Sequence, residues 1–287
     1  MATEKGYKMV LPFETTGGNS KILREAKILT AGSLLLIDFT HPLSQTSQIP
    51  TNESTIKNIA YKEAMSIIGT SEANISPSII NTATNNGMIL EFTAKKGLHG
   101  IVSQTNDVSI GNDFQIILPS KIRQYIANNI SRGFFVSVWD RKTRKALTTT
   151  SANFSLGHSN TTNYINTFQT GGGGMLGTQL GTRSNSNNLN STDPQLNNAA
   201  VNAITGTFNT NFNNYNGFKF GSSWAYGSFE VNKACSNILY QLHIIDLQSA
   251  GMTYAEADAA DLAAFQKAFA VGGKFYNDTF TDPSVLP

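Results

Sequence analysis

Cysteine and charge are both scarce in this sequence. Its 287 residues include one cysteine, Cys235, which excludes an intrachain disulfide and a zinc site built from cysteines. Cys235 lies in an apolar run, so we expect a small buried core residue. Charged residues make up 14% of the chain, about half the usual share. The net charge of +2 argues against a nucleic-acid partner held by phosphate neutralisation.

Long hydrophobic runs are missing as well. The longest, residues 34–37 and 133–139, are far shorter than the roughly 18 residues that a membrane-spanning helix needs. Residues 1–8 are polar and lack the apolar stretch of a signal peptide. We therefore expect a protein that is made in a cytoplasm and has no membrane partner.

Familiar motifs for metal binding and nucleophilic catalysis do not occur. No Gly-x-Ser-x-Gly pattern marks a hydrolase nucleophile, and the glycine run 171–174 lacks the Lys-Ser/Thr of a phosphate loop. The four histidines are scattered, without the paired spacing of a metal site on a helix: His41, His99, His158 and His243. We expect no catalytic site, no metal site and no cofactor.

The nearest carboxylate pairs do not suit glycoside hydrolysis. Glu256, Asp258 and Asp261 fall within a predicted C-terminal helix, and we expect them on its exposed side. A glycosidase needs two carboxyl groups that flank the scissile bond. The sequence therefore favours a protein that is not an enzyme, and a polysaccharide depolymerase is the weakest of the alternatives.

Two other residue groups are candidates for binding. Asn106, Asp107, Asn112 and Asp113 lie together in a loop, where they are either oxygen ligands for Ca²⁺ or ordinary turn residues. Trp224 and Tyr226, flanked by glycine and serine, could form a platform for sugar rings. Trp139 closes an apolar run, so we expect it in the core.

Asparagine replaces much of the missing charge. The chain has 30 asparagines, and 16 of them fall within residues 151–216, where Arg183 and Asp193 are the sole formal charges. Such a polar stretch cannot bury much apolar surface. We interpret it as an Asn/Gly-rich insertion, either a flexible surface segment or an ordered loop layer that contacts neighbouring subunits.

Short apolar runs between turn-rich gaps predict β-strands. Several alternate in polarity, and Tyr240, Leu242 and Ile244 should share one face of a half-buried strand. The predicted strands span residues 33–39, 88–93, 114–118, 133–139, 218–220, 226–231 and 238–245. This pattern favours an all-β fold.

Two helices interrupt the predicted strands. Residues 120–130 place four side chains on one face: Ile122, Tyr125, Ile126 and Ile130. The second helix begins at the capping box 253–256 and should end at Gly272-Gly273. Its apolar stripe consists of Leu262, Phe265 and Phe269.

Residues 1–30 have the pattern of an arm. Gly17 and Gly18 break the chain, and a short amphipathic segment follows, with Ile22, Leu23, Ala26 and Leu29 on one face. The arm either docks on a neighbouring subunit or packs against its own domain.

The C-terminal passage NILYQLHIIDLQSAGMTYAEADAADLAAFQKAFAVGGKFYNDTFTDP (237–283) carries a family resemblance. Its features are a strand that ends in an acidic loop (239–246), Thr-Tyr-Ala-Glu at a helix start (253–256), Phe265, Phe269, Gly-Gly-Lys-Phe-Tyr (272–276), Asp278 and Asp-Pro (282–283). The passage resembles the closing segment of tailed-bacteriophage virion proteins that carry a concanavalin A-like (LamG-type) jelly-roll domain. Residues 34–39 and 133–139 are similar to strands of the same domains, whereas residues 151–216 depart from them.

The resemblance implies a concanavalin A-like jelly-roll β-sandwich, to which the residue patterns add an N-terminal arm and a C-terminal helix. The expected organisation is an arm at 1–30, a sandwich at 31–250 with the insertion 151–216, and a helix and tail at 251–287 packed on the sandwich. It also implies a virion component and brings no catalytic residues.

We therefore expect a non-enzymatic structural component of a tailed phage, an exposed accessory subunit of the capsid (a decoration protein) or of the tail or baseplate. It would be a homo-oligomer made in the host cytoplasm and located in the virion, with other virion proteins and copies of itself as partners. A nearly uncharged surface suits repeated interfaces, because no charge has to be desolvated at each one. The alternative is a lectin-like adhesin that binds host surface glycan near Trp224 and Tyr226.

Overall fold

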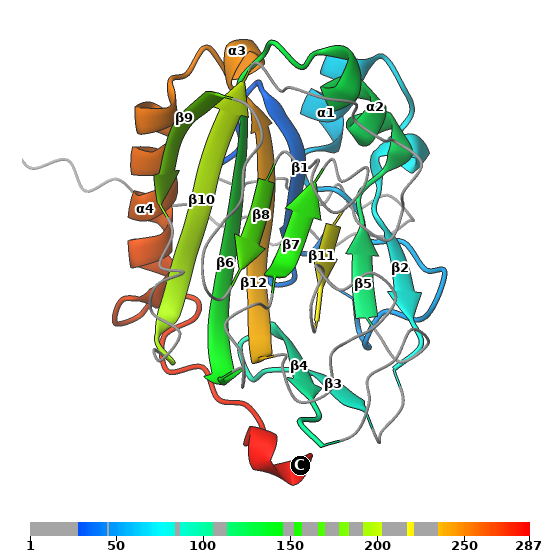
Figure 1. The fold of residues 1–287 in the computed structure, drawn as a ribbon, viewed down its shortest axis with the longest axis vertical. Helices are drawn as coiled ribbons and strands as arrows, with labels where there is room; N and C mark the ends of the chain where they lie inside the picture. Colours follow the sequence, from blue (N-terminus) through cyan, green and yellow to red (C-terminus); the bar gives the residue numbers. More distant parts are fainter. Residues whose placement is uncertain are drawn as a thin grey trace, which may run out of the picture.

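Two antiparallel β-sheets face each other, and helices cover the outer side and one end of the larger sheet (Figure 1). The computed structural model of the chain describes residues 28–44, 46–83, 87–105, 114–145, 152–156, 166–169, 178–183, 192–202, 217–220 and 235–287. Every strand pairing within these ranges is antiparallel. The protein is thus mostly β, as the sequence predicts.

Seven strands form the larger sheet, in the order β3-β4-β12-β6-β10-β9, with β1 paired to β12. They are β1 (Ser33–Asp38), β3 (Met88–Phe92), β4 (Leu98–Val102), β6 (Phe134–Arg144), β9 (Thr178–Arg183), β10 (Pro194–Asn202) and β12 (Ser236–Asp246). Strand β12 pairs with β6 on one side and with both β4 and β1 on the other. It is therefore the central strand, and all of its residues are buried.

The smaller sheet has five strands, in the order β2-β5-β11-β7-β8. They are β2 (Ser78–Asn81), β5 (Phe114–Ile117), β7 (Ala152–Leu156), β8 (Asn166–Gln169) and β11 (Gly217–Lys219). Strand neighbours in both sheets come from distant parts of the chain, since β1 pairs with β12 and β5 with β11.

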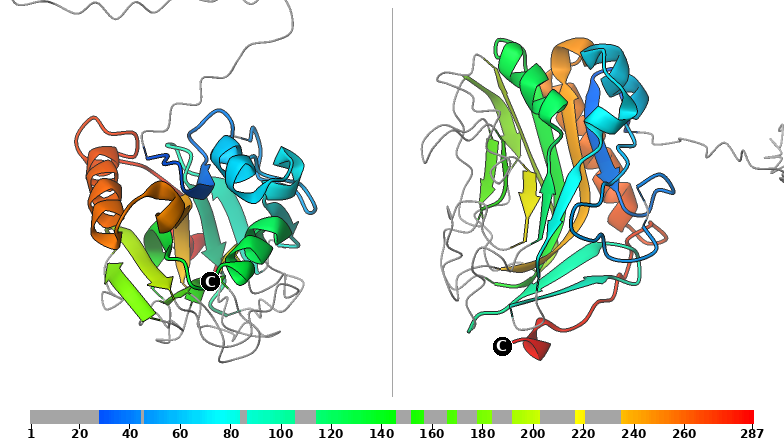
Figure 2. Two further views of the ribbon diagram at one scale, coloured as in Figure 1. Left: turned by 90° about the horizontal axis from the view of Figure 1, so that it is seen from above. Right: turned by 90° about the vertical axis from the view of Figure 1, so that its right-hand side faces the viewer.

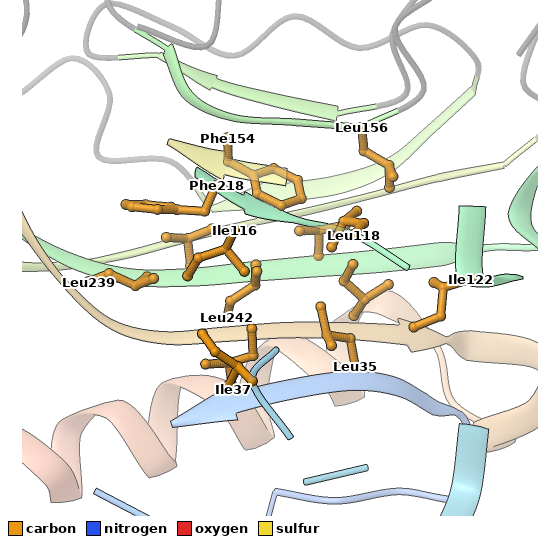
Figure 3. Close-up of a cluster of buried hydrophobic side chains, with 14 of the residues drawn as sticks. Leu35, Ile37, Ile116, Leu118, Ile122, Phe154, Leu156, Phe218, Leu239 and Leu242 are labelled. Carbon is orange, nitrogen blue, oxygen red and sulfur yellow. The ribbon is translucent and has the colours of Figure 1, made fainter. Parts of the chain in front are cut away.

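The main core lies between the sheets (Figure 3). Phe154 and Ile116 of the smaller sheet face Leu35 and Leu242 of the larger one, and all four are fully buried. Successive side chains of strand β6 point to opposite faces of the larger sheet, and both faces are covered. Its inner side chains are Phe134, Val136 and Val138, and its outer ones include Phe135 and Trp139.

The longest helix makes a third layer on the outer face of the larger sheet, and the other helices lie at one end of the sandwich (Figure 2). The helices are α1 (Tyr61–Ile68), α2 (Ser120–Asn128), α3 (Leu247–Ala250) and α4 (Tyr254–Phe269), with 3₁₀ turns at Glu72–Ile75 and Pro283–Val285. Helix α4 begins at a capping box between Thr253 and Glu256. None of the described helices is long and apolar enough to cross a membrane.

A bulge changes which side chains of β12 face the core. The register with β6 shifts between Leu239 and Gln241, so an extra residue enters the strand there. Tyr240 consequently packs on the side of α4, while Leu242 and Ile244 stay in the inner core. The prediction that these three side chains share one face is wrong, and the strand is buried on both faces rather than half-buried.

The described parts of residues 151–216 belong to both sheets and do not form an appendage. They contain β7 to β10, and β10 pairs with β6 over eight residues. Amide side chains make this possible because polar partners meet them inside the sheet. Asn197 Nδ2 donates to Asp140 Oδ1 at 2.9 Å, and Asn198 is fully buried. The described residues of this stretch are therefore strands of the two sheets, and the rest of the predicted insertion lies outside the described residues.

Two helix ends differ from the predicted ones. Helix α2 ends at Asn128, so Ile130 lies beyond it and is 37% exposed. Helix α4 ends at Phe269, because Ala270 is already extended, and Gly272 takes a positive φ of 77° in the next turn.

Other predictions fall partly or wholly outside the described residues. The strand predicted at 226–231 and residues 1–27 of the arm lie outside them. Ile28 and Leu29, at the end of the arm, pack against Leu36 and Ile59 of their own domain. Cys235 is buried, as predicted.

Candidate functional site

A cleft of about 470 Å³ opens on the outer face of the larger sheet. Its floor comes from three strands, with Asp38 of β1, Gln241 of β12 and Trp139 of β6. One wall is the last part of α4 and the turn that follows it, residues 264–274, and the other is the turn after β1 together with Ile28. The size lies in the range of small-molecule sites, roughly 300–1,000 Å³.

Strand pairing positions two polar groups side by side on this floor. Asp38 and Gln241 are cross-strand partners in the β1–β12 register, although 202 residues separate them in the chain. Side chains directly opposite each other in an antiparallel pair lie about 5 Å apart at Cβ. The sheet thus brings a carboxylate and an amide together.

The carboxylate of Asp38 is already engaged on both oxygens. Oδ1 accepts hydrogen bonds from the backbone N of Thr40 at 2.9 Å and from its hydroxyl at 2.6 Å. Oδ2 forms an ion pair with Lys274 from the turn after α4. Each carboxylate oxygen has two lone pairs, so Asp38 retains acceptor capacity.

The amide of Gln241 is the unusual group. Gln241 is 2% exposed, and its Nε2 is buried without a hydrogen-bond acceptor among the described residues. A buried donor left unpaired costs about 1–3 kcal/mol. Because the cleft adjoins Gln241, an acceptor that enters it could relieve this cost.

Trp139 forms the aromatic part of the floor. Its ring packs edge-on against Phe265 of α4, with centroids 5.5 Å apart. The ammonium of Lys274 lies 5.8 Å from the ring centroid of Trp139 and 4.7 Å from that of Phe275. The prediction that Trp139 is a core residue is confirmed, since it is 2% exposed.

Beside the cleft, a partly buried polar cluster joins α4 to β9 and β10. Asp258 accepts two hydrogen bonds from Arg183, at 2.5 and 2.6 Å, and these hold its pKa below the usual value. Asn198 donates to Asp258 at 2.9 Å and to Asp261 at 3.2 Å. The hydroxyl of Tyr254 donates to Asn198 Oδ1 at 3.0 Å.

This cluster corrects one prediction from the sequence. Asp258 and Asp261 do not lie on the exposed side of the helix, because both face the sheet, and Asp261 is 1% exposed. Burial raises the pKa of Asp261 to about 6. Glu256 does lie at the exposed N-terminus of α4. Its carboxylate accepts a hydrogen bond from the backbone N of Thr253, and its own backbone N donates to the Thr253 hydroxyl.

A second cluster has the order of a catalytic triad. The hydroxyl of Thr143 lies 2.8 Å from Nε2 of His99, and Nδ1 of His99 lies 2.8 Å from Glu91 Oε1. The C-terminal tail closes this cluster, because Phe280 packs edge-on against the His99 ring and Thr281 bonds to Glu91. His99 is fully buried, so we interpret the cluster as a clamp on the tail.

The other candidates from the sequence lie outside the described residues. These are the aromatic pair Trp224 and Tyr226, and the loop residues Asn106, Asp107, Asn112 and Asp113. Across the ranges that the structure describes, no group of three or more His, Cys, Asp or Glu residues could hold a metal ion.

The cleft could not be found from local sequence. Asp38 and Gln241 sit in two separate predicted strands, and Lys267 and Lys274 sit in and after the C-terminal helix. No motif links them, and only the pairing of the first and last strands brings them together. No protein-family model, curated protein or solved structure matches this chain.

Proposed function

We propose that the chain is a non-enzymatic structural component of a tailed-bacteriophage virion, an exposed accessory subunit of the capsid or of the tail or baseplate. The proposal rests on the resemblance of the C-terminal passage to virion proteins with a concanavalin A-like domain. Its partners would be other virion proteins and copies of itself.

The observation that carries the proposal is what the resembling residues do in the fold. Tyr240 packs against Phe269 and Phe275, with ring centroids 5.0 and 4.4 Å apart, and Phe265 packs against Trp139. The tyrosine hydroxyl donates to Asp278 at 3.1 Å. The passage therefore acts as one packing unit that fixes α4 and the tail to the sandwich, which favours an architectural role over a catalytic one.

We also propose that the sandwich has concanavalin A-like jelly-roll topology. Two facing antiparallel sheets, in which early strands pair with late ones, support this topology. The helix and tail would then be an addition to the outer face of the larger sheet.

The carboxylates near the cleft support a non-enzymatic role. Asp258 is held by Arg183, Asp261 by Trp139, and Asp38 by Lys274. Each is thus committed to a structural contact. With only 14% charged residues in the chain, repeated subunit contacts would bury few unpaired charges.

A reconstitution experiment tests the proposal. The purified chain is mixed with phage particles that lack it, and attachment is followed by negative-stain microscopy and sedimentation. We expect stoichiometric attachment at symmetry-related positions, competed by unlabelled protein. A chain that stays monomeric and never cosediments with particles would contradict the proposal.

A further inference from the structure

We propose that the cleft between β1 and α4 binds an acidic sugar, a pyranose ring with a carboxylate such as a uronic acid unit. This inference goes beyond the structural role and rests on other residues than the aromatic pair Trp224 and Tyr226. It rests on the positions of four polar groups around an apolar cavity.

The first argument is the unpaired donor at the floor. Gln241 Nε2 needs an acceptor, and the described residues do not supply one. Buried polar groups in folded proteins are nearly always paired, so an unpaired group beside a cavity calls for an explanation. A ring or hydroxyl oxygen of a sugar is an acceptor of suitable size.

The second argument is charge. Lys267 and Lys274 both line the cleft, whereas Asp38 is its one carboxylate. Lys274 is paired with Asp38, and in the described part of the chain no carboxylate pairs with Lys267, which is exposed on α4. The cleft therefore has an excess of one positive charge, which favours an anionic ligand.

The third argument selects a sugar over a simple apolar acid. The Asp38–Lys274 pair offers an acceptor and a donor at one point, which matches adjacent hydroxyl groups. An aliphatic carboxylate carries no hydroxyl group that could donate to Asp38 or accept from Lys274. The remaining walls include Ile28, Leu36 and Ala264, which suit the apolar faces of a ring.

Ligand-observed NMR and calorimetry with the full chain test the inference. The probes are methyl glucuronide, methyl glucoside and butyrate, which separate the carboxylate from the ring. We expect methyl glucuronide to bind in the millimolar range, and the other two to bind at least about fivefold more weakly.

Three variants locate the site. Lys267→Ala and Gln241→Leu should each weaken methyl glucuronide binding by about five- to tenfold. Lys62→Ala removes an exposed lysine from α1, away from the cleft, and should leave binding unchanged. Circular dichroism confirms that each variant is folded.

Four results would contradict the inference. Equal binding of methyl glucoside would remove the role of the carboxylate, and equal binding of butyrate would remove the role of the ring. If both cleft variants bind methyl glucuronide as well as the parent does, the site lies elsewhere. If the parent does not bind methyl glucuronide at millimolar concentration, the proposed site does not exist. The test uses the isolated chain without particles, so a negative result does not bear on the virion proposal, which the reconstitution experiment tests separately.

Discussion

The indole Nε1 of Trp139 donates a 2.8 Å hydrogen bond to the carboxylate of Asp261, across the boundary between the larger sheet and helix α4. Both residues are almost fully buried. One hydrogen bond thus ties the third layer of the fold to a strand of the sandwich, at the edge of the candidate cleft.

The burial of Asp261 makes stability depend on pH. Burial raises the pKa of Asp261 to about 6 from 3.8, so the folded chain holds a proton that the unfolded chain releases. The stabilisation is complete below the unfolded pKa and is lost as the pH rises through about 6. From about pH 5 to about pH 7.5, the free energy of unfolding should fall by about 1 kcal/mol relative to Asp261→Asn.

Urea unfolding at both pH values measures this difference. Glu72→Gln, which removes a partly exposed carboxylate paired with Lys57, serves as the control and should keep the pH dependence of the parent. If the parent and Asp261→Asn unfold in parallel at both pH values, Asp261 does not hold the extra proton.

His243 should act in the opposite direction. It is fully buried beside Ser33, with Nε2 3.0 Å from the serine hydroxyl, and burial lowers its pKa from 6.5 to about 3. Below about pH 6.5, His243 therefore binds a proton in the unfolded chain and stays neutral in the folded chain. Between about pH 7.5 and about pH 4.5, this group should cost about 2–3 kcal/mol of stability.

The variant His243→Gln should lose that acid sensitivity. Equilibrium unfolding across the same pH range measures it, with His41→Gln, a partly exposed histidine, as the control. An acid sensitivity that persists in His243→Gln and disappears in His41→Gln would contradict the assignment.

Gly181 of β9 allows the ring of Tyr254 of α4 to approach the strand closely. A Cβ added at Gly181 would lie 2.1 Å from the tyrosine ring. Gly181→Ala should therefore destabilise the fold by about 1–3 kcal/mol. In a Tyr254→Ala background the same substitution should cost much less, and thermal unfolding of the four variants measures this coupling. If Gly181→Ala lowers stability equally in the parent and in Tyr254→Ala, the tyrosine ring does not clash with the added methyl group.

The tail clamp predicts a difference between two threonines. The hydroxyl of Thr281 donates to Glu91 Oε2 at 2.6 Å, whereas Thr279 contributes its backbone carbonyl to Ala94. Thr281→Val should lower the free energy of unfolding by about 1 kcal/mol, and Thr279→Val should change it little. Urea unfolding compares them. If Thr279→Val is the more damaging substitution, the clamp is not centred on Glu91.

Much of the fold could be predicted from apolar runs and local signals. Residues 33–39, 88–93 and 114–118 match β1, β3 and β5 to within about a residue, because short runs rich in β-branched, leucine and aromatic residues between turns are typical of strands. The capping box placed the start of α4 because its two hydrogen bonds are local.

Tertiary partners account for what the sequence could not predict. Strand β10 contains Asn197 and Asn198, whose amides look like loop residues until Asp140 and Asp258 are placed beside them. The bulge that turns Tyr240 toward α4 depends on pairing with β6. Asp261 looks like an exposed helix residue because its partner, Trp139, lies 122 residues away in the sequence.

Quantitative mass spectrometry of purified phage particles tests the central claim most directly. On the proposed function, tailed particles form from the genome that encodes this chain; they are purified, and the copy number of the chain is measured relative to the major capsid protein. The account predicts a fixed copy number that fits a symmetric ring or shell. Particles that assemble fully and contain none of the chain would contradict it.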